Sequence, residues 1–198
     1  MPGLLFAIGF GASIGLLTTG NQEERAGDDP SPAMLAQMEL AKPGPEHKRL
    51  AALAGEWSVG MIPAGASEAV RTGSAVIKSI MDERFIDISI TLGEEAAASS
   101  LRYTVGFDRR HDEYTVTLVD SSGTYPVYSR GKDEGDRIRT RGTDDDPYMT
   151  SLGLEKEFIF DLILGDEQAD IVLHFVDTRV EERPALEMYR YRLNRTIK

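Results

Sequence analysis

Apolar and polar residues alternate along most of the chain after residue 45. Residues 84–92 show the pattern most clearly, because four aliphatic side chains fall at every second position: Ile86, Ile88, Ile90 and Leu92. Such alternation predicts a β-strand with one buried face. Turn residues interrupt the pattern at regular intervals and divide it into ten predicted strands: residues 57–62, 70–79, 84–92, 101–107, 114–119, 124–129, 136–142, 157–164, 170–177 and 186–195.

The connections between these predicted strands are short, which limits how the strands can pair. Parallel neighbours need a crossover of a dozen or more residues, so consecutive strands are expected to pair antiparallel. About ten half-apolar strands bury their faces and lose their exposed edges when the sheet closes on itself. The sequence therefore predicts an all-β fold consisting of one up-and-down antiparallel barrel, with a two-sheet sandwich as the alternative.

The first 45 residues do not follow this pattern. Residues 3–17 are apolar and uncharged, which is too short for a membrane-spanning helix and suits a secretory signal. No Lys or Arg precedes them and no clear cleavage site follows, so a misplaced start codon or a disordered tail remains an alternative. We expect a signal segment at 1–22, a proline-rich linker with a short helix at 23–45, and the barrel domain at 46–198. The favoured location is periplasmic or extracellular, and the cytoplasm is the alternative.

Residues 45–57 read Pro-Glu-His-Lys-Arg-Leu-Ala-Ala-Leu-Ala-Gly-Glu-Trp, with Leu50 and Leu53 on one side of a short helix. This segment resembles the opening of lipocalin-like, calycin-type barrels, in which a short helix leads into Gly-x-Trp, here Gly55 and Trp57. The resemblance implies that the tryptophan plugs one end of the barrel and that an arginine of the last strand lies across it. The candidates are Arg190, Arg192 and Arg195, and Arg192 is taken as the signature residue.

The chain also resembles a bacterial barrel family that is catalogued as a domain of unknown function. The shared features are the Pro-x-His-x-x-Leu and Gly-x-Trp opening, a middle segment at 106–108 followed by Tyr114, and a Tyr-x-Arg-like ending at 189–192. The resemblance covers residues 46–195. It implies the barrel fold, and it implies no reaction because the family has no agreed function.

Composition narrows the classes of partner. The 198 residues carry a formal net charge of −11, which argues against a nucleic-acid binder, because such proteins need a basic surface. The same charge disfavours adhesion to anionic membranes, and no stable membrane insertion of the barrel is expected. Cysteine is absent, which removes disulfides and thiolate chemistry but leaves the compartment open.

Few residues suggest catalysis or a metal site. Ser121-Ser122-Gly123 lacks the Gly-x-Ser-x-Gly elbow of a serine nucleophile, and residues 144–146 do not form an EF-hand loop. We expect no metal site and no cofactor, and enzymatic activity is disfavoured. His174 lies on a predicted strand and shares a face with Val172 and Val176. If that face lines the barrel, His174 could contact a ligand or serve as the axial ligand of haem, and otherwise it is an outward-facing histidine.

Aromatic residues at alternating strand positions either line a pocket or fill the core of the barrel. The candidate ligand-binding residues are Tyr103, Tyr114, Phe160 and His174. The function favoured by the pattern is the binding of a small apolar, lipid-like molecule in the barrel lumen. The alternative is a structural or protein-interaction barrel with a filled core and no ligand. The sequence leaves the identity of any ligand, the open or filled state of the lumen and the oligomeric state undetermined.

Overall fold

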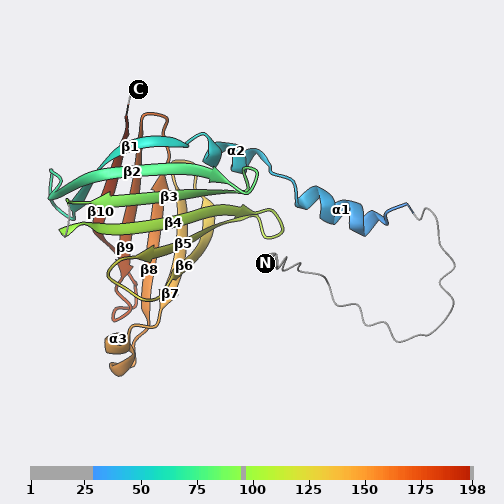
Figure 1. Cartoon of the computed structure of the whole chain (residues 1–198). Helices are drawn as coiled ribbons and strands as arrows, with labels where there is room; N and C mark the ends of the chain where they lie inside the picture. The colour runs from blue at the N-terminus through green and yellow to red at the C-terminus, as the bar shows by residue number, and fades with distance from the viewer. Residues whose placement is uncertain (1–28, 95–96, 197–198) are drawn as a thin grey trace, which may run out of the picture.

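The structure is a computed structural model that describes residues 29–94 and 97–196, so the expected signal segment at 1–22 lies outside the described residues. Ten antiparallel strands form one closed barrel in the order β1-β10-β9-β8-β7-β6-β5-β4-β3-β2 (Figure 1). The strands are β1 (Gly55–Pro63), β2 (Arg71–Ile80), β3 (Phe85–Leu92), β4 (Ser99–Asp108), β5 (Glu113–Asp120), β6 (Val127–Asp133), β7 (Ile138–Asp144), β8 (Lys156–Ile163), β9 (Gln168–Val176) and β10 (Ala185–Arg195).

Pairing between the first and last strands closes the barrel. Each strand pairs with the next in sequence, and β10 returns to pair with β1 over seven residue pairs, from Trp57 opposite Arg195 to Pro63 opposite Tyr189. This pairing leaves no free sheet edge and excludes the two-sheet sandwich. The predicted all-β barrel of ten strands with a short helix before the first strand is confirmed.

Three short helices accompany the strands: α1 (Pro32–Leu40), α2 (Pro45–Ala51) and α3 (Pro147–Ser151). The first lies inside the expected linker, and all of its residues are exposed. The third was not predicted, although its signal is present: Asp146 accepts hydrogen bonds from two backbone N–H groups at the start of α3, and Pro147 occupies the first turn. Among the described residues, no helix is long and apolar enough to cross a membrane.

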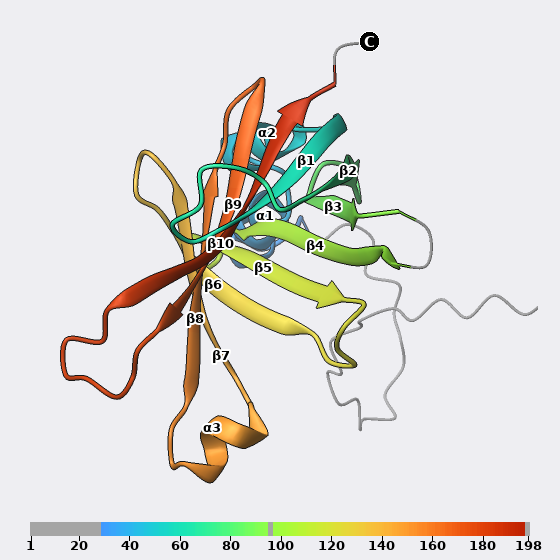
Figure 2. The same cartoon turned by 90° about the vertical axis from the view of Figure 1, so that its left-hand side faces the viewer.

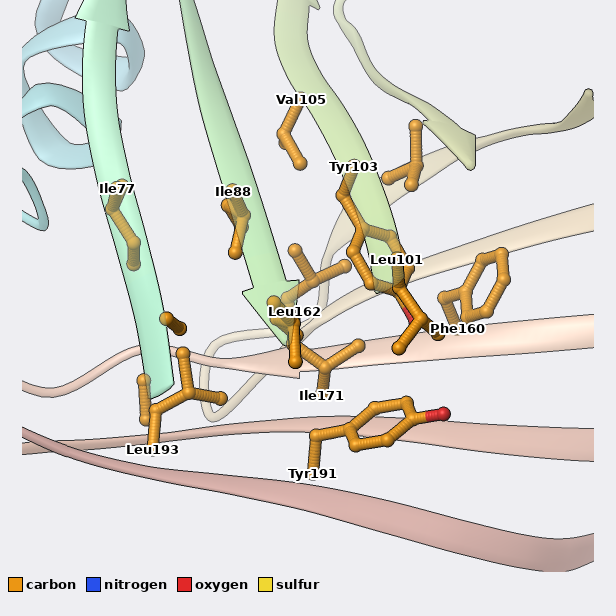
Figure 3. Packing of buried hydrophobic residues seen from close by; sticks show 14 of the residues in the cluster. Ile77, Ile88, Leu101, Tyr103, Val105, Phe160, Leu162, Ile171, Tyr191 and Leu193 are labelled. Atoms are coloured by element: carbon orange, nitrogen blue, oxygen red, sulfur yellow. The ribbon is translucent and has the colours of Figure 1, made fainter. Parts of the chain in front are cut away.

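Alternate side chains of every strand point into the barrel and form its core. In β9 the inward residues are Ala169, Ile171 and Leu173, all of which belong to the buried apolar cluster. Figure 3 shows how side chains from strands on opposite walls meet in the interior, with Ile88 and Tyr103 on one side and Ile171 and Tyr191 on the other. The middle of the barrel is therefore packed with side chains.

The two ends of the barrel differ. Helix α2 covers the end at which β1 begins, and Leu50 of the helix and Leu53 just after it are buried against the core. His47 fixes the start of α2, because its Nδ1 accepts a hydrogen bond from the Gly44 N–H at 2.9 Å. We call this the closed end and the opposite end the mouth. In Figure 2 the mouth faces the viewer, and the β7–β8 connection with α3 extends from it.

Candidate functional site

Trp57 plugs the closed end of the barrel. The residue is only 1% exposed, and its indole N–H donates to the Leu53 carbonyl at 3.0 Å. The guanidinium of Arg195, directly opposite on β10, lies 4.3 Å from the centre of the indole ring. It also donates to the carbonyls of Ala52 and Ala54 at 3.2 and 3.1 Å. Arg195 therefore ties the end of α2 to the first and last strands.

The position of Arg195 corrects the choice of Arg192 as the signature arginine. The register sets Arg195 opposite Trp57, whereas Arg192 points outward and donates to both carboxylate oxygens of Asp170 at 3.2 and 3.4 Å. Gly55 belongs to the same closed end. Its φ is +148°, and a Cβ at this position would lie 2.9 Å from the Arg195 guanidinium, so glycine leaves room for the arginine.

Aromatic side chains fill the middle of the lumen. Tyr103 and Phe160 are nearly fully buried and pack edge to face with their ring centres 5.8 Å apart. Figure 3 shows Tyr191 projecting into the same region from β10. Burial raises the pKa values of Tyr103 and Tyr191 well above the usual range, so both hydroxyls stay protonated at neutral pH. Tyr191 shares a side-chain hydrogen bond with Tyr189 nearer the mouth.

The mouth contains a hollow of about 180 Å³. Its apolar lining comes from β5, β6, β8, β9 and β10: Leu118, Val127, Phe158, Phe160, Leu173, Phe175 and Tyr189. Polar groups of Asp120, Ser122, Asp144 and Lys156 also line it. A second hollow of about 210 Å³ adjoins it beside α3 and shares Lys156 and Phe175 with the first. Among the described residues the lumen is thus hollowed near its mouth, and Phe160 lies at the border between the hollow and the packed middle.

Lys156 is the cation that lines the hollow at the mouth. Its ammonium lies 3.1 Å from a carboxylate oxygen of Asp144, 3.4 Å from one of Asp146, and 5.3 Å from the centre of the Phe175 ring. Burial alone would lower the pKa of Lys156, but the two carboxylates outweigh it and hold the pKa above its usual value. Because two carboxylates already balance its one ammonium, Lys156 offers no surplus positive charge to an anion.

The structure separates the four candidate ligand residues. Tyr103 and Phe160 lie together in the lumen, whereas Tyr114 lies at the closed end. There its ring packs against Phe107 at 4.9 Å between ring centres. Burial raises the pKa of Tyr114, and a side-chain hydrogen bond with Arg49 of α2 opposes this shift. Tyr114 therefore anchors the helix side of the core and does not reach the hollow.

His174 faces outward. The inward positions of β9 on either side of it are occupied by Leu173 and Phe175, which line the hollow. The expectation that His174 contacts a ligand or haem required this residue to face the lumen. The structure places it on the outer face instead. There, Nε2 of His174 lies 3.0 Å from a carboxylate oxygen of Asp161. Within the described residues, no group of three or more His, Asp or Glu side chains is arranged to hold a metal ion.

A row of arginine-paired carboxylates on the outer face was missed by sequence reasoning. Asp161 is 1% exposed, and Arg139 donates to both of its oxygens at 2.7 Å. Glu157 is paired in the same way by Arg141 at 2.6 Å and by Arg183 at 2.8 Å. The sequence does contain a sign of these ion pairs. Arginines stand at alternate positions 137, 139 and 141 of one predicted strand, and Glu157 and Asp161 share one face of the next strand. These contacts give the outer face a structural role.

Together these features define a closed antiparallel barrel that is plugged at one end, packed in the middle and hollowed at the mouth. The chain belongs to the DUF1579 family, described as proteins of unknown function, whose family model matches residues 42–154. This match confirms the expected membership of a barrel family of unknown function, while the lipocalin-like kinship stays a prediction. No curated protein matches the chain.

Proposed function

We propose that this barrel binds a small apolar molecule in the hollow at its mouth. The observation that carries the proposal is the aromatic and aliphatic lining provided by Phe158, Phe160, Phe175, Leu118 and Leu173. An apolar cavity of roughly 150 Å³ is large enough to hold benzene in a protein core. A hollow of about 180 Å³ therefore suits a single ring or a short alkyl chain. The adjoining hollow beside α3 gives room for the remainder of a longer molecule.

The expected affinity follows from the apolar surface that such a ligand buries. Each buried methylene contributes about 0.8 kcal/mol, so an alkyl chain with four to six buried methylenes gains roughly 3–5 kcal/mol. This corresponds to dissociation constants of roughly 0.1 to several mM for a simple probe such as 1-octanol. A natural ligand that also occupies the second hollow would bind more tightly.

The packed middle of the barrel favours a second candidate, a barrel with a filled core that acts through its surface. Tyr103, Phe160 and Tyr191 already occupy the space that a deep ligand would need. This arrangement rules out a long chain threaded through the resting barrel, and it limits the proposed ligand to the mouth. The two candidates differ in a single measurable property, which is occupancy of the mouth.

Titration of the full-length protein with 1-octanol, followed by the NMR shifts of methyl groups, tests the proposal. Saturable shifts confined to Leu118, Val127 and Leu173 are expected, because these residues are at or beside the hollow. Native mass spectrometry of protein purified from its own host, with organic extraction, would show whether an apolar molecule travels with it. Shifts that do not saturate, or that spread over the outer face, would support the filled-core barrel.

A pair of matched variants localises the binding. Val127→Trp places a large ring in the hollow from β6, whereas Val119→Trp places the same ring on the outer face of β5, where the valine is 43% exposed. The first variant should lose octanol binding, and the second should retain it. Equal effects of the two substitutions would refute a site at the mouth.

A further inference from the structure

A larger hollow lies at the opposite end of the molecule and outside the barrel wall. It has a volume of about 520 Å³ and lies between the end of α1, the start of α2 and the outer face of β3 to β6. Its apolar surface is formed by Leu40, Phe85 and Phe107. The Phe85 ring lies over Gly106, where a Cβ would come within 2.3 Å of the ring, so glycine at this position lets the aromatic side chain lie flat on the strand.

Positive charge is concentrated around this hollow. Five of its lining residues are cationic and one is a carboxylate: Lys42, Arg84, Arg109, Arg110 and Arg130 against Asp108. The chain as a whole has 33 acidic and 22 basic residues, so the local balance is the reverse of the overall one. Such a local excess attracts anions even to an acidic protein, because fields from nearby charges dominate within a Debye length of about 8–10 Å.

In the described part of the chain, three of the arginines have no close, buried carboxylate to balance their charge. Arg109 donates to the carbonyls of Glu39 and Lys42 at 2.5 and 2.9 Å, and within residues 29–94 and 97–196 it forms no ion pair with a carboxylate. Arg130 donates to the Tyr128 hydroxyl at 2.6 Å, and the nearest carboxylate in an ion pair with it, that of Glu113, is 3.9 Å away.

Arg84 is also weakly paired, since its contact with the Asp82 carboxylate is 3.5 Å long and the Asp82 side chain is 97% exposed. By contrast, the charge of Arg110 is balanced by Asp108, because Arg110 donates two hydrogen bonds to this carboxylate at 2.8 and 2.9 Å. The hydrogen bonds from Arg110 counteract burial and, with His111 and the Arg110 backbone N–H, hold the pKa of Asp108 well below its usual range. The one carboxylate in the hollow is thus already neutralised by its own neighbour.

We propose that this hollow binds an organic anion, with a carboxylate or phosphate group at Arg84, Arg109 and Arg130 and an apolar body on Phe85 and Phe107. The planar, five-donor guanidinium suits both anions, because it can donate two parallel hydrogen bonds to either. The hydrogen bonds of Arg109 and Arg130 to neighbouring protein oxygens hold their guanidinium groups in place before a ligand arrives. The volume lies within the range of about 300–1,000 Å³ typical of small-molecule pockets. This site does not depend on the proposed function of the mouth.

The test compares three probes that share one alkyl chain: sodium octanoate, octyl phosphate and 1-octanol. Calorimetry with the full-length protein should show both anions binding at least about tenfold more tightly than the alcohol, because only they engage the arginines. Affinity should fall as NaCl is raised, since the charged groups are partly exposed. The stronger of the two anions identifies the head group. Equal affinity for octanoate, octyl phosphate and octanol would overturn the proposal.

The double variant Arg84→Gln/Arg130→Gln should weaken anion binding by about tenfold or more. The matched control is Arg179→Gln, which also removes a positive charge but lies in the β9–β10 loop and is paired with Asp177 at 2.8 Å. The control should bind the anions as the unaltered protein does. Unchanged affinity in the double variant, with its fold intact by circular dichroism, would refute the site.

A third variant separates this site from the mouth. Val127→Trp blocks the mouth and should leave anion binding unchanged, because the packed middle of the barrel lies between the two hollows. Loss of octanoate binding in Val127→Trp would place the anion at the mouth beside Lys156 and would overturn the proposal. Loss of octanol binding alone in that variant would support two separate sites.

Discussion

Replacing Arg195 should weaken the closed end of the barrel more than the loss of an ordinary surface charge. The guanidinium stacks 4.3 Å from the Trp57 ring centre and donates to the carbonyls of Ala52, Ala54 and Asp166. Arg195→Met retains a side chain of similar length over the indole but removes the charge and every donor. The substitution therefore isolates the electrostatic part of the contact.

The size of the effect can be worked from these contacts. A partly exposed cation over an indole contributes about 0.5–1 kcal/mol. Hydrogen bonds from a charged donor to carbonyls contribute about 1.5–3 kcal/mol when buried, and less here because Arg195 is half-buried and water replaces some of them. A loss of about 2–3 kcal/mol in the free energy of unfolding is expected. For a domain of this size the midpoint of thermal unfolding should fall by about 5–10 °C.

Trp57 reports the transition directly, because it is the sole tryptophan in the sequence and is buried in the folded state. Urea unfolding followed by its fluorescence and by far-ultraviolet circular dichroism should give coincident curves. Arg195→Lys, which keeps the charge without the fork of donors, should fall between the unaltered protein and Arg195→Met. The control Arg179→Met, at an exposed ion pair, should change stability by less than about 1 kcal/mol. An Arg195→Met effect no larger than this control would show that the arginine does not hold the closed end together.

Three further predictions concern the outer wall. Gly131→Ala should destabilise the barrel by about 1–3 kcal/mol or more in urea unfolding, because the new Cβ would lie 1.8 Å from the Arg139 carbonyl oxygen. Gly123→Ala, whose Cβ would meet nothing closer than 3.7 Å, should be tolerated. Arg139→Met should cost about 1–3 kcal/mol by thermal unfolding, because it leaves the buried Asp161 carboxylate with weaker partners, and an effect below about 0.5 kcal/mol would contradict this role. Burial tends to raise the pKa of Asp161, but the hydrogen bonds and charge of Arg139 outweigh it and leave the pKa lowered. A carboxyl whose folded pKa is depressed stabilises the fold above its unfolded pKa of about 4 and loses that contribution as pH falls through the folded value. Unfolding between pH 6 and about pH 2 should therefore show a shallower decline in stability for Asp161→Asn than for the unaltered protein, and parallel declines would contradict the assignment.

The strand pattern could be predicted from sequence because burial on one face imposes a period of two, and every predicted strand has a counterpart in the structure. Closure followed from the short connections and the need to cover edges. The helix α3 was missed because its signal, Asp146 before Pro147, lies in an acidic loop that resembles an ordinary turn. Boundaries differ by up to four residues, as at β6, which spans Val127–Asp133 where residues 124–129 were expected.

The candidate site was predicted less well than the fold, because the alternation shows that two faces exist without showing which one is inside. Residues 168–176 are apolar at most positions on both faces, since Val172 and Val176 are buried although they lie on the outer face. Alternation alone therefore could not decide whether His174 or Leu173 is the inward residue. Pairing with β8 sets His174 opposite Ile159 on the outer face. A one-residue change of register would have reversed the result.

The hollow beside α1 was beyond sequence reasoning for a different reason. Its arginines come from three separate turns and strands, at 84, 109–110 and 130, and no spacing in the sequence brings them together. The overall charge of −11 points away from an anion site, yet charge acts locally. The barrel's register brings these arginines together beside residues 37–47 at the closed end. Closure of the barrel thus does more than bury a core: it forms one hollow at the mouth and a cationic hollow at the opposite end, and packed aromatic side chains separate the two.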